Sequence, residues 1–275
     1  MTNADFHKVI KDCMNRHDIR IYGFCSFENI LPLNECRAKA RLPENSQTVI
    51  VCAFPYLIKE KSARNLSYYA CVRDYHITVM NILKNAAAEL SELTGFIFEP
   101  FSDNSPVREV SAAVKAGIGV LGDNGLLITE KYGSYVFLGE FVTDMKIDTP
   151  VYNKSCLHCG MCQKKCRGNA LENGKVNEDK CISAITQKKG ELSDEETELI
   201  LENGLAWGCD GCQTVCPMNR NAEETYISDF IDSAHHYLKA DEVNERIKTS
   251  AYNWRGKKTI LRNLEIFSEK FYDRS

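Results

Sequence analysis

The chain has 275 residues, of which 44% are hydrophobic and 26% are charged, and its formal net charge is −4. This composition is typical of a globular protein with a sizeable core, and it excludes a strongly basic protein that binds nucleic acid through charge alone. The sequence contains neither a membrane-spanning apolar run nor the pattern of a signal peptide, so we expect a cytoplasmic protein.

The first 150 residues alternate strand-like and helix-like patterns. An amphipathic helix is expected at the N-terminus, strands over residues 18–27 and 48–54, and a long helix over residues 66–93. A short strand over residues 96–98 is followed by a helix that starts at Pro106 and ends near Gly117. Two further strands are expected over residues 126–129 and 135–143. The pattern predicts an α/β domain over residues 1–150.

Residues 117–125 contain four glycines in nine positions. The segment lacks the Gly-Lys-Ser/Thr ending of a phosphate loop. It also precedes a strand instead of linking a strand to a helix, which argues against a dinucleotide-binding fingerprint. Its glycines either let the backbone approach another group closely or form turns.

The C-terminal half begins after a boundary near residues 148–150. We expect a cysteine-rich domain over residues 151–222 and an amphipathic helical segment over residues 223–275. Within the cysteine-rich domain, Ser193 and Glu196 form a capping box that opens a helix, and Gly204 closes it.

The chain contains thirteen cysteines, and their distribution is uneven. Eight lie between Cys156 and Cys216, and nothing indicates export to a compartment where they would form disulfides. We expect these eight to be metal ligands. The other five occur singly in the first 71 residues and are predicted to be small core residues: Cys13, Cys25, Cys36, Cys52 and Cys71.

The first four clustered cysteines have the spacing C-x2-C-x2-C-x3-C. This run is typical of two-cluster ferredoxins, in which the fourth cysteine binds the other 4Fe-4S cluster. Two zinc sites would also use all eight cysteines, but zinc ribbons favour separated C-x2-C pairs. Arg167 stands where ferredoxins usually have proline. The crossover predicts one cluster on Cys156, Cys159, Cys162 and Cys216, and another on Cys166, Cys181, Cys209 and Cys212.

From about residue 48 to residue 267 the sequence resembles the epoxyqueuosine reductase family, which is related to reductive dehalogenases. The resemblance is carried in order by residues 69–76, 101–109, 115–119, 133–140, the eight cysteines, and residues 180–183, 207–217 and 260–264. It implies an α+β protein with a nitroreductase-like α/β domain that binds cobalamin. A two-cluster ferredoxin-like domain and a short helical C-terminus would follow.

The resemblance also implies an activity. Members of this family are oxidoreductases that reduce epoxyqueuosine to queuosine in tRNA, a step of queuosine biosynthesis and tRNA processing. The clusters would reduce cobalamin to cob(I)alamin, and a ferredoxin or flavodoxin would supply electrons to a monomeric protein. The alternatives are a dehalogenase-like reductase of a small molecule and a non-catalytic corrinoid-binding or electron-transfer protein.

The aspartate that matches the family's proposed proton donor is Asp103. A general acid near the leaving oxygen suits the reaction, and we expect burial to raise the pKa of Asp103 and keep it protonated. The residues alone favour a different role for Asp103, as a helix N-cap ahead of Pro106.

Further residues are implied as cobalamin contacts. Asp74 and His76 begin the Asp-x-His-x-x-Gly pattern of corrinoid enzymes with a histidine lower ligand, but Val79 occupies the glycine position. We therefore expect base-off cobalamin without a protein lower ligand, although these two residues could instead be a helix-surface pair without a role. The implied contacts are Tyr69, Arg73, Asp74, His76, Val107, Gly117, Gly119, Gly122, Asn124 and Ser134.

The chain departs from the family pattern in two ways. Val120 and Asp123 stand where the family has Trp and Lys, and residues 124–129 are closer to the dehalogenase sequence. The chain also resembles a short form without the C-terminal helical repeats that help grip tRNA. Because an acidic residue in place of a basic one weakens binding of phosphates, both departures favour a weaker contact with tRNA.

Overall fold

The computed structural model describes residues 3–59, 63–150, 152, 154–172 and 174–272. Its contacts divide into two compact units, the first made of residues 1–55, 75–121 and 126–156, and the second of residues 56–74, 122–125 and 157–275. These units differ from the expected boundaries at residues 150 and 222. Two short segments of the first half, residues 56–74 and 122–125, belong to the C-terminal unit.

The first unit is built on a four-stranded antiparallel sheet with the order β1-β2-β6-β3. Every residue of β2 is buried, as its continuous apolar run predicts. The strands expected over residues 18–27, 48–54 and 135–143 are confirmed, and the short strand begins two residues later than expected. The strands are β1 (Ile21–Ser26), β2 (Thr48–Pro55), β3 (Phe98–Phe101) and β6 (Val136–Thr143).

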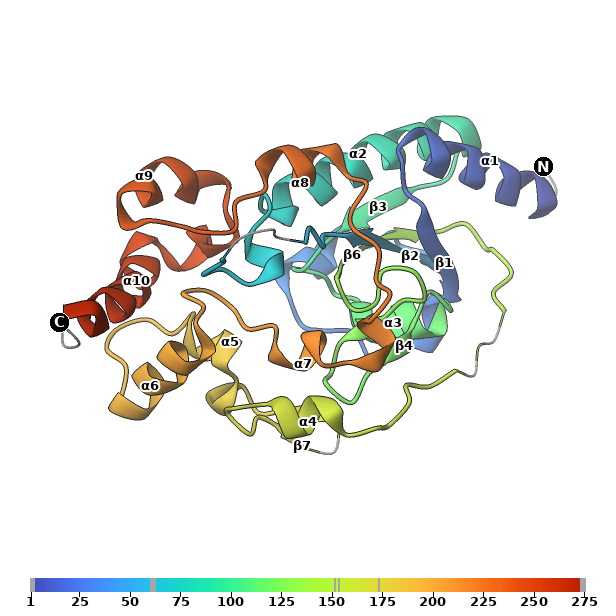
Figure 1. Ribbon diagram of the computed structural model, residues 1–275. Helices are drawn as coiled ribbons and strands as arrows, with labels where there is room; N and C mark the ends of the chain where they lie inside the picture. Colours follow the sequence, from blue (N-terminus) through green and yellow to red (C-terminus); the bar gives the residue numbers. More distant parts are fainter. Residues whose placement is uncertain (1–2, 60–62, 151, 153, 173, 273–275) are drawn as a thin grey trace. The chain divides into compact units, whose positions relative to one another are not determined.

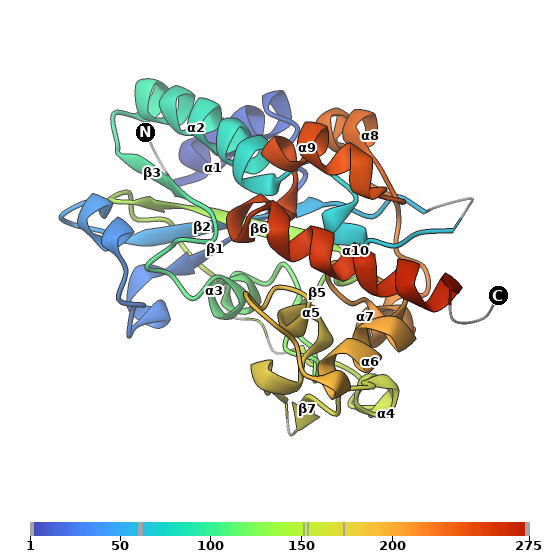
Figure 2. The same cartoon turned by 90° about the vertical axis from the view of Figure 1, so that its left-hand side faces the viewer.

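Helices cover both faces of this sheet. On one face α2 (Tyr75–Thr94) packs on β3 and β6 and carries α1 (Asn3–Arg16), and on the other lies α3 (Glu109–Lys115), as Figure 1 and Figure 2 show. Gly139 of β6 permits the close packing of α2, because a Cβ atom there would lie 2.7 Å from Leu83 Cδ1. The residues of β6 directly before and after Gly139 point to the opposite face of the sheet, where α3 lies.

Smaller elements complete the first unit. The expected strand over residues 126–129 is confirmed, and it pairs with a short strand that was not expected, on the other side of the glycine-rich turn. They are β4 (Val120–Leu121) and β5 (Leu127–Ile128), and two 3-10 helices precede β2, namely η1 (Phe27–Ile30) and η2 (Arg37–Arg41).

Two helices begin later than predicted. α2 begins at Tyr75 instead of residue 66, because the preceding backbone bonds to distant segments: Ser67 N–H donates to Trp207 O, and Asp74 N–H donates to Thr249 O. Only the 3-10 turn η3 (Tyr68–Ala70) forms in that region. α3 begins at Glu109 instead of Pro106, because the residues before it form an irregular loop.

The second unit consists of short helices and turns. The capping box of Ser193 and Glu196 opens its longest helix before the C-terminal segment, and Gly204 closes that helix with φ of 75°, as predicted. Its elements are α4 (Met161–Lys165), β7 (Leu171–Glu172), β8 (Lys175–Val176), η4 (Glu178–Lys180), α5 (Ile182–Ile185), α6 (Asp194–Asn203), α7 (Gly211–Thr214) and η5 (Pro217–Asn219).

The expected helical segment after residue 223 is confirmed. It contains α8 (Ser228–Ser233), η6 (Ala240–Glu242), α9 (Val243–Arg246), η7 (Ile247–Thr249), η8 (Ala251–Arg255) and α10 (Lys257–Tyr272). Fully buried Asn263 fixes α10, since its Nδ2 donates to Thr186 O and Ala206 O, each at 2.7 Å. None of the described helices combines the length and the apolar character needed to cross a membrane.

The five scattered cysteines behave mostly as core residues. Cys13, Cys25, Cys52 and Cys71 are buried, and Cys36 is partly exposed. Burial is the main cause that raises the pKa of Cys13 and of Cys25 to about 12. These two thiols are therefore protonated near neutral pH, as expected of small core residues.

Candidate functional site

The eight clustered cysteines lie on loops and short helices. Cys156 is the last residue of the first unit, and the other seven belong to the second. Cys162 lies on α4 and Cys212 on α7, and these two helices pack against each other. None of the eight forms a disulfide, so their thiols are available as ligands.

Four of the thiols act on one another electrostatically. Burial raises the pKa of Cys212 to about 12, and Cys209, Cys181 and Cys166 raise it further. Burial also raises the pKa of Cys209 to about 11, with Cys181 and Cys166 again among the contributing groups. Cys166 and Cys181 thus lie near Cys209 and Cys212, and four thiols brought together in this way fit a site that a metal cluster would occupy.

A second electrostatic interaction joins Cys162, from the first cysteine run, to Cys216. Burial raises the pKa of Cys162, and among its neighbours is the thiol of Cys216, which lies far along the chain. Cys216 is therefore close enough to Cys162 to act on it electrostatically. This arrangement supports the crossover grouping expected from the ferredoxin spacing.

Donors surround the second group of thiols. The backbone N–H of Ala170 donates to Cys166 Sγ at 3.3 Å, and that of Gly211 donates to Cys209 Sγ at 3.5 Å. The Asn124 side chain forms a hydrogen bond with Cys212 that lowers its pKa. Hydrogen bonds to ligand sulfur stabilise the thiolate and tune the potential of an iron–sulfur cluster.

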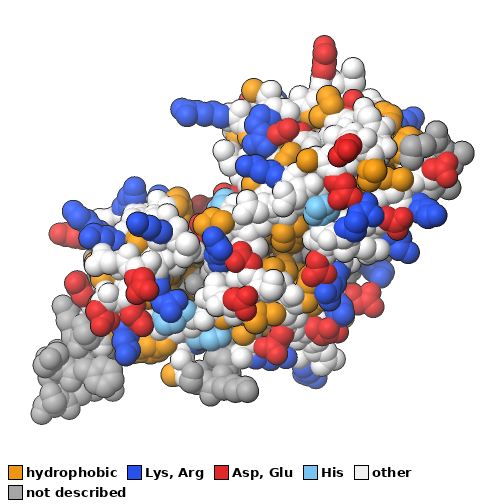
Figure 3. Space-filling view, turned by 90° about the horizontal axis from the view of Figure 1, so that it is seen from above, with side chains coloured by type: hydrophobic (Ala, Val, Ile, Leu, Met, Phe, Trp, Pro, Cys, Tyr) orange, Lys and Arg blue, Asp and Glu red, His pale blue; other side chains and the backbone are white. Residues whose placement is uncertain are grey.

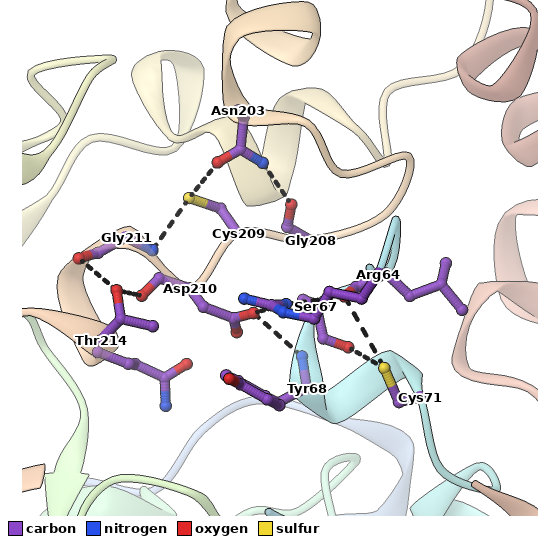
Figure 4. A network of polar contacts seen from close by, with 12 residues as sticks. Arg64, Ser67, Tyr68, Cys71, Asn203, Gly208, Cys209, Asp210, Gly211 and Thr214 are labelled. Atoms are coloured by element: carbon purple, nitrogen blue, oxygen red, sulfur yellow. Dashed lines mark hydrogen bonds and ion pairs between the residues drawn. The ribbon is translucent and has the colours of Figure 1, made fainter. Parts of the chain in front are cut away.

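A buried ion pair fixes the loop between two of these cysteines. Figure 4 shows Asp210, which follows Cys209, facing Arg64 and Tyr68. Its Oδ2 is 2.5 Å from Arg64 Nη1 and accepts the Tyr68 N–H at 3.1 Å, and only 2% of its side chain is exposed. On the other side Asn203 Oδ1 lies 3.3 Å from Cys209 Sγ. The ion pair and these hydrogen bonds therefore fix the backbone of the loop that carries the expected ligand Cys209.

In the first unit, Asp103 pairs with His76. Asp103 lies in the loop between β3 and α3 with φ of 63°, and its Oδ2 is 3.1 Å from His76 Nε2. Both side chains are well exposed, 59% for Asp103 and 48% for His76. His76 lies in the first turn of α2, in a helix as expected, while the N-cap of α3 is Arg108 and not Asp103.

The expected protonation of Asp103 is wrong for this structure. The hydrogen bond from His76 is the main influence, and it lowers the pKa of Asp103 although burial acts in the opposite direction. Because the carboxylate accepts this bond, His76 Nε2 carries the hydrogen. The proton at this site is therefore on His76 Nε2, in a hydrogen bond to the Asp103 carboxylate, and not on a neutral aspartic acid.

Sequence reasoning missed two carboxyl groups beside this loop. Glu140 of β6 is completely buried, and burial followed by the charge of Glu109 raises its pKa well above the ordinary value. Burial also raises the pKa of Glu109 to about 7. An acidic residue inside the apolar run of residues 136–143 was the available signal, because a buried charge is costly without a partner.

The first unit contains five of the residues implied as cobalamin contacts. Val107 is 1% exposed and lies in the hydrophobic core beside α3, so its side chain is not available to a ligand. Gly117 has φ of 74°, and a Cβ atom there would lie 2.2 Å from the ring of Tyr152. An aromatic ring therefore approaches this glycine closely. His76, Gly119 and Ser134 are the remaining three.

The other five implied contacts belong to the second unit. The Tyr69 hydroxyl accepts a hydrogen bond from Gln187 Nε2 at 3.3 Å, and Arg73 Nη1 is 2.9 Å from Asp229 Oδ1. A cavity of about 180 Å³ beside Arg73 is smaller than the usual pocket for a drug-sized ligand. Asp74, Gly122 and Asn124 complete the set, and Asn124 is the one that contacts a cysteine.

Two family models match the chain. Residues 37–104 match "Epoxyqueuosine reductase QueG, DUF1730", and residues 155–219 match "4Fe-4S double cluster binding domain". An epoxyqueuosine reductase of Aliivibrio fischeri is 36% identical over 212 residues, which cover 76% of this chain and 54% of that protein. That of Lactococcus garvieae is 31% identical over 258 residues, which cover 84% and 71%. The chain thus spans about half the length of the first relative.

Solved structures show the same fold. Epoxyqueuosine reductase from Streptococcus thermophilus has a TM-score of 0.79 at 25% identity, with 94% of this chain and 79% of that chain covered. An epoxyqueuosine reductase solved with a tRNA-Tyr epoxyqueuosine-modified stem loop has the same TM-score at 24% identity, with 95% and 81% covered. The Bacillus subtilis protein, solved with its catalytic aspartate loop swung out of the active site, has a TM-score of 0.77 at 23% identity, with 95% and 81% covered.

The hydrogen bond between His76 and Asp103 is testable by titration. Because this bond is the main influence that lowers the pKa of Asp103, His76→Ala is expected to raise that pKa, as measured by carboxyl carbon NMR with Asp103→Asn for assignment. Tyr75→Phe removes a weaker hydrogen bond to the same carboxylate and is expected to raise the pKa less. An unchanged Asp103 titration in His76→Ala would contradict the pairing.

Proposed function

The chain belongs to the epoxyqueuosine reductase family, and we propose that it reduces epoxyqueuosine to queuosine in tRNA with two 4Fe-4S clusters and cobalamin. The observation that carries this proposal is the exposed Asp103 carboxylate, hydrogen-bonded to His76 at the position that the family resemblance gives to the proton donor. The curated relatives bear the name of this activity, and a related structure holds an epoxyqueuosine-modified stem loop.

The proposed clusters follow the crossover grouping. Cys166, Cys181, Cys209 and Cys212 would hold one cluster, which agrees with the mutual influence of these four thiols. The pairing of Cys162 with Cys216 supports the other cluster, and the C-x2-C-x2-C spacing adds Cys156 and Cys159. Each cluster would bind its ligands as thiolates, and the positive charge of its iron would offset the repulsion between them.

Cobalamin is proposed as the electron acceptor of the clusters. When bound, it supplies a strongly reducing and nucleophilic cobalt centre. His76 fits a cofactor without a protein lower ligand, because its Nε2 is already hydrogen-bonded to Asp103. The proposed contacts stay those expected from the resemblance, with the Val107 side chain excluded by its burial in the core.

The residues of the chain would supply the proton for the reaction. Reduction of an epoxide to an alkene takes two electrons and two protons and releases the oxygen as water. Asp103 would donate to the leaving oxygen, and His76 would return a proton through the hydrogen bond between them. The same hydrogen bond lowers the pKa of Asp103, so its carboxylate would deliver a proton that it receives from His76.

The substrate assignment is supported by relatives more than by surface charge. In Figure 3 the Lys and Arg side chains are interspersed with Asp and Glu side chains over the face that is drawn. Asp123, which replaces the basic residue of the family, is 2.8 Å from His158 Nδ1 and so has a local partner. We propose recognition of the modified nucleotide itself, together with few phosphate contacts, by a cytoplasmic monomer that receives electrons from a ferredoxin or flavodoxin.

Cysteine variants test the grouping of the ligands. Cys159→Ser and Cys216→Ser are expected to lose the same cluster, so each retains roughly four irons per chain and both show the same electron paramagnetic resonance spectrum. Cys166→Ser and Cys212→Ser should share a different spectrum. Cys36→Ala, which changes a scattered cysteine, should keep the full iron content.

The grouping would be contradicted if Cys216→Ser gave the spectrum of Cys212→Ser. Those two cysteines would then bind one cluster, as their closeness in sequence suggests, and the crossover would be wrong.

The proton-donor role predicts a loss of turnover. Asp103→Asn keeps the shape of the side chain and removes its acid function, so turnover of an epoxyqueuosine-containing tRNA stem loop is expected to fall by roughly 100-fold or more. Cobalamin binding, measured by the visible spectrum, should stay unchanged. Glu130→Gln, which alters an exposed carboxylate of the same unit, serves as the matched control.

Normal turnover by Asp103→Asn would refute the proton-donor role. A wild-type protein that binds cobalamin but does not convert the stem loop would refute the tRNA substrate, and conversion of a halogenated small molecule instead would favour the dehalogenase-like alternative.

A further inference from the structure

The loop that carries Asp103 is fixed from behind by two carboxyl groups. Glu109 Oε1 accepts the backbone N–H of Asp103 at 3.0 Å. Glu140 Oε1 accepts the hydroxyl of Ser105, and the Ser105 Oγ accepts the N–H of Val107 at 3.0 Å. Residues 103–107 are therefore attached directly at two points to a pair of acidic side chains, and Val107 joins them through the Ser105 hydroxyl.

This attachment compensates for an unfavourable backbone conformation. Asp103 has φ of 63°, in the left-handed region, where a residue with a side chain is disfavoured. The loop also contacts Asn34, whose Nδ2 lies 3.4 Å from Ser105 O and 3.3 Å from Val107 O. However, the hydrogen bond from Asp103 N–H goes to Glu109, so the conformation at the proposed acid itself depends on this carboxyl group.

The surroundings of Glu140 require a proton. It is fully buried on the sheet face that carries Leu138 and Val142, in the apolar core beneath α3. Its Oε2 has no donor within hydrogen-bonding distance among the described residues, while the carboxyl group of Glu109 acts directly on it. A carboxylate oxygen without a donor is very costly in such a place. A hydrogen between Glu140 and Glu109 would satisfy it.

We propose that Glu109 and Glu140 form a proton-sharing latch that holds the Asp103 loop in its working position. With Glu140 protonated, the Glu109 carboxylate accepts both the Glu140 O–H and the Asp103 N–H. When the shared proton is lost, two buried negative charges repel each other and the loop is released. Both glutamates are positioning residues, since they act on the reaction only through Asp103.

The raised pKa values of both glutamates agree with this arrangement. Glu109 is partly exposed as a residue, but its carboxyl group is surrounded by protein, and burial raises its pKa to about 7. Burial, followed by the charge of Glu109, raises the pKa of Glu140 well above its ordinary value of 4.5. Because both folded-state pKa values are raised, the stabilisation is complete at low pH and is lost as the pH rises through and beyond about 7.

Other titratable groups face the pair from each neighbouring element. Asp103 and His76 act on Glu109 from the loop and from α2. On β1 and β2, Cys25 and Cys52 have pKa values that burial raises and that the charge of Glu140 raises further. Lys115 of α3 acts on Cys25 in the opposite sense. Of these described groups, none takes the place of the direct contact between the Glu109 and Glu140 carboxyl groups.

The latch rests on the function proposed for Asp103, but amide hydrogen exchange tests it without turnover. The reporters are the amides of Asp103 and Val107 in the full-length chain, corrected for intrinsic exchange, between about pH 6 and about pH 10. In the wild type, protection should fall by roughly tenfold per pH unit once the shared proton is lost. The amides of β3 serve as an internal reference for general unfolding.

Conservative variants separate the latch from a merely structural role. Glu140→Gln supplies a fixed amide hydrogen to Glu109 and still accepts the Ser105 hydroxyl, so loop protection should persist and become independent of pH. Glu109→Gln should behave in the same way, and Glu109→Ala should lose protection at every pH. Glu130→Gln should retain the wild-type profile.

A wild-type pH profile in both glutamine variants would overturn the latch, as would constant protection in the wild type. If Asp103→Asn keeps full turnover while the exchange profiles follow the expectation, the proposed function fails and the latch stands. If Glu140→Gln does not fold, Glu109→Gln alone decides the outcome by the same profile.

Discussion

The burial of several acidic groups close together is the constraint on which the proposed chemistry of both units depends. In the second unit, burial raises the pKa of Cys209 and of Cys212, and the nearby thiols of Cys166 and Cys181 raise it further. Such a set is stable either as neutral thiols or as thiolates around a positive centre. The Asp210–Arg64 ion pair and the backbone donors hold the loops so that the second state is preorganised.

The first unit meets the same constraint with a proton. Glu140 lies in an apolar core, and its partner Glu109 is also the acceptor for the backbone of Asp103. The buried glutamate that needs a proton is thereby connected, through Glu109, to the loop whose aspartate we propose as the proton donor. The hydrogen bond between His76 and Asp103 adds the exposed end of this arrangement, where a substrate has access to the carboxylate.

Sequence reasoning succeeded where a feature depends on local residues. The buried strand at residues 48–54, the capping box at Ser193 and the cysteine run are all written in neighbouring positions, and each is present in the fold. It failed where distant segments decide. Residues 66–74 have helical apolar spacing, but their backbone N–H groups bond to Trp207 and Thr249, so no α-helix forms there.

The same distinction explains the errors at the candidate site. The position of Asp103 followed from the family resemblance, but its pKa depends on His76, which only the fold brings within hydrogen-bonding distance. Glu109 and Glu140 come from a helix and a strand that are separated in sequence, so neither residue signals its partner. The glycine-rich segment was left open between close approach and turn formation, and Gly117 shows close approach to Tyr152.

We propose that this one chain binds both iron–sulfur clusters and cobalamin. The most direct measurement is the metal content and visible spectrum of the full-length protein, purified without oxygen, before and after cobalamin is added. We predict roughly eight irons with matching inorganic sulfide per chain, and uptake of cobalamin with a base-off spectrum. Zinc in place of iron, or no uptake of cobalamin by the iron-loaded protein, would contradict the account.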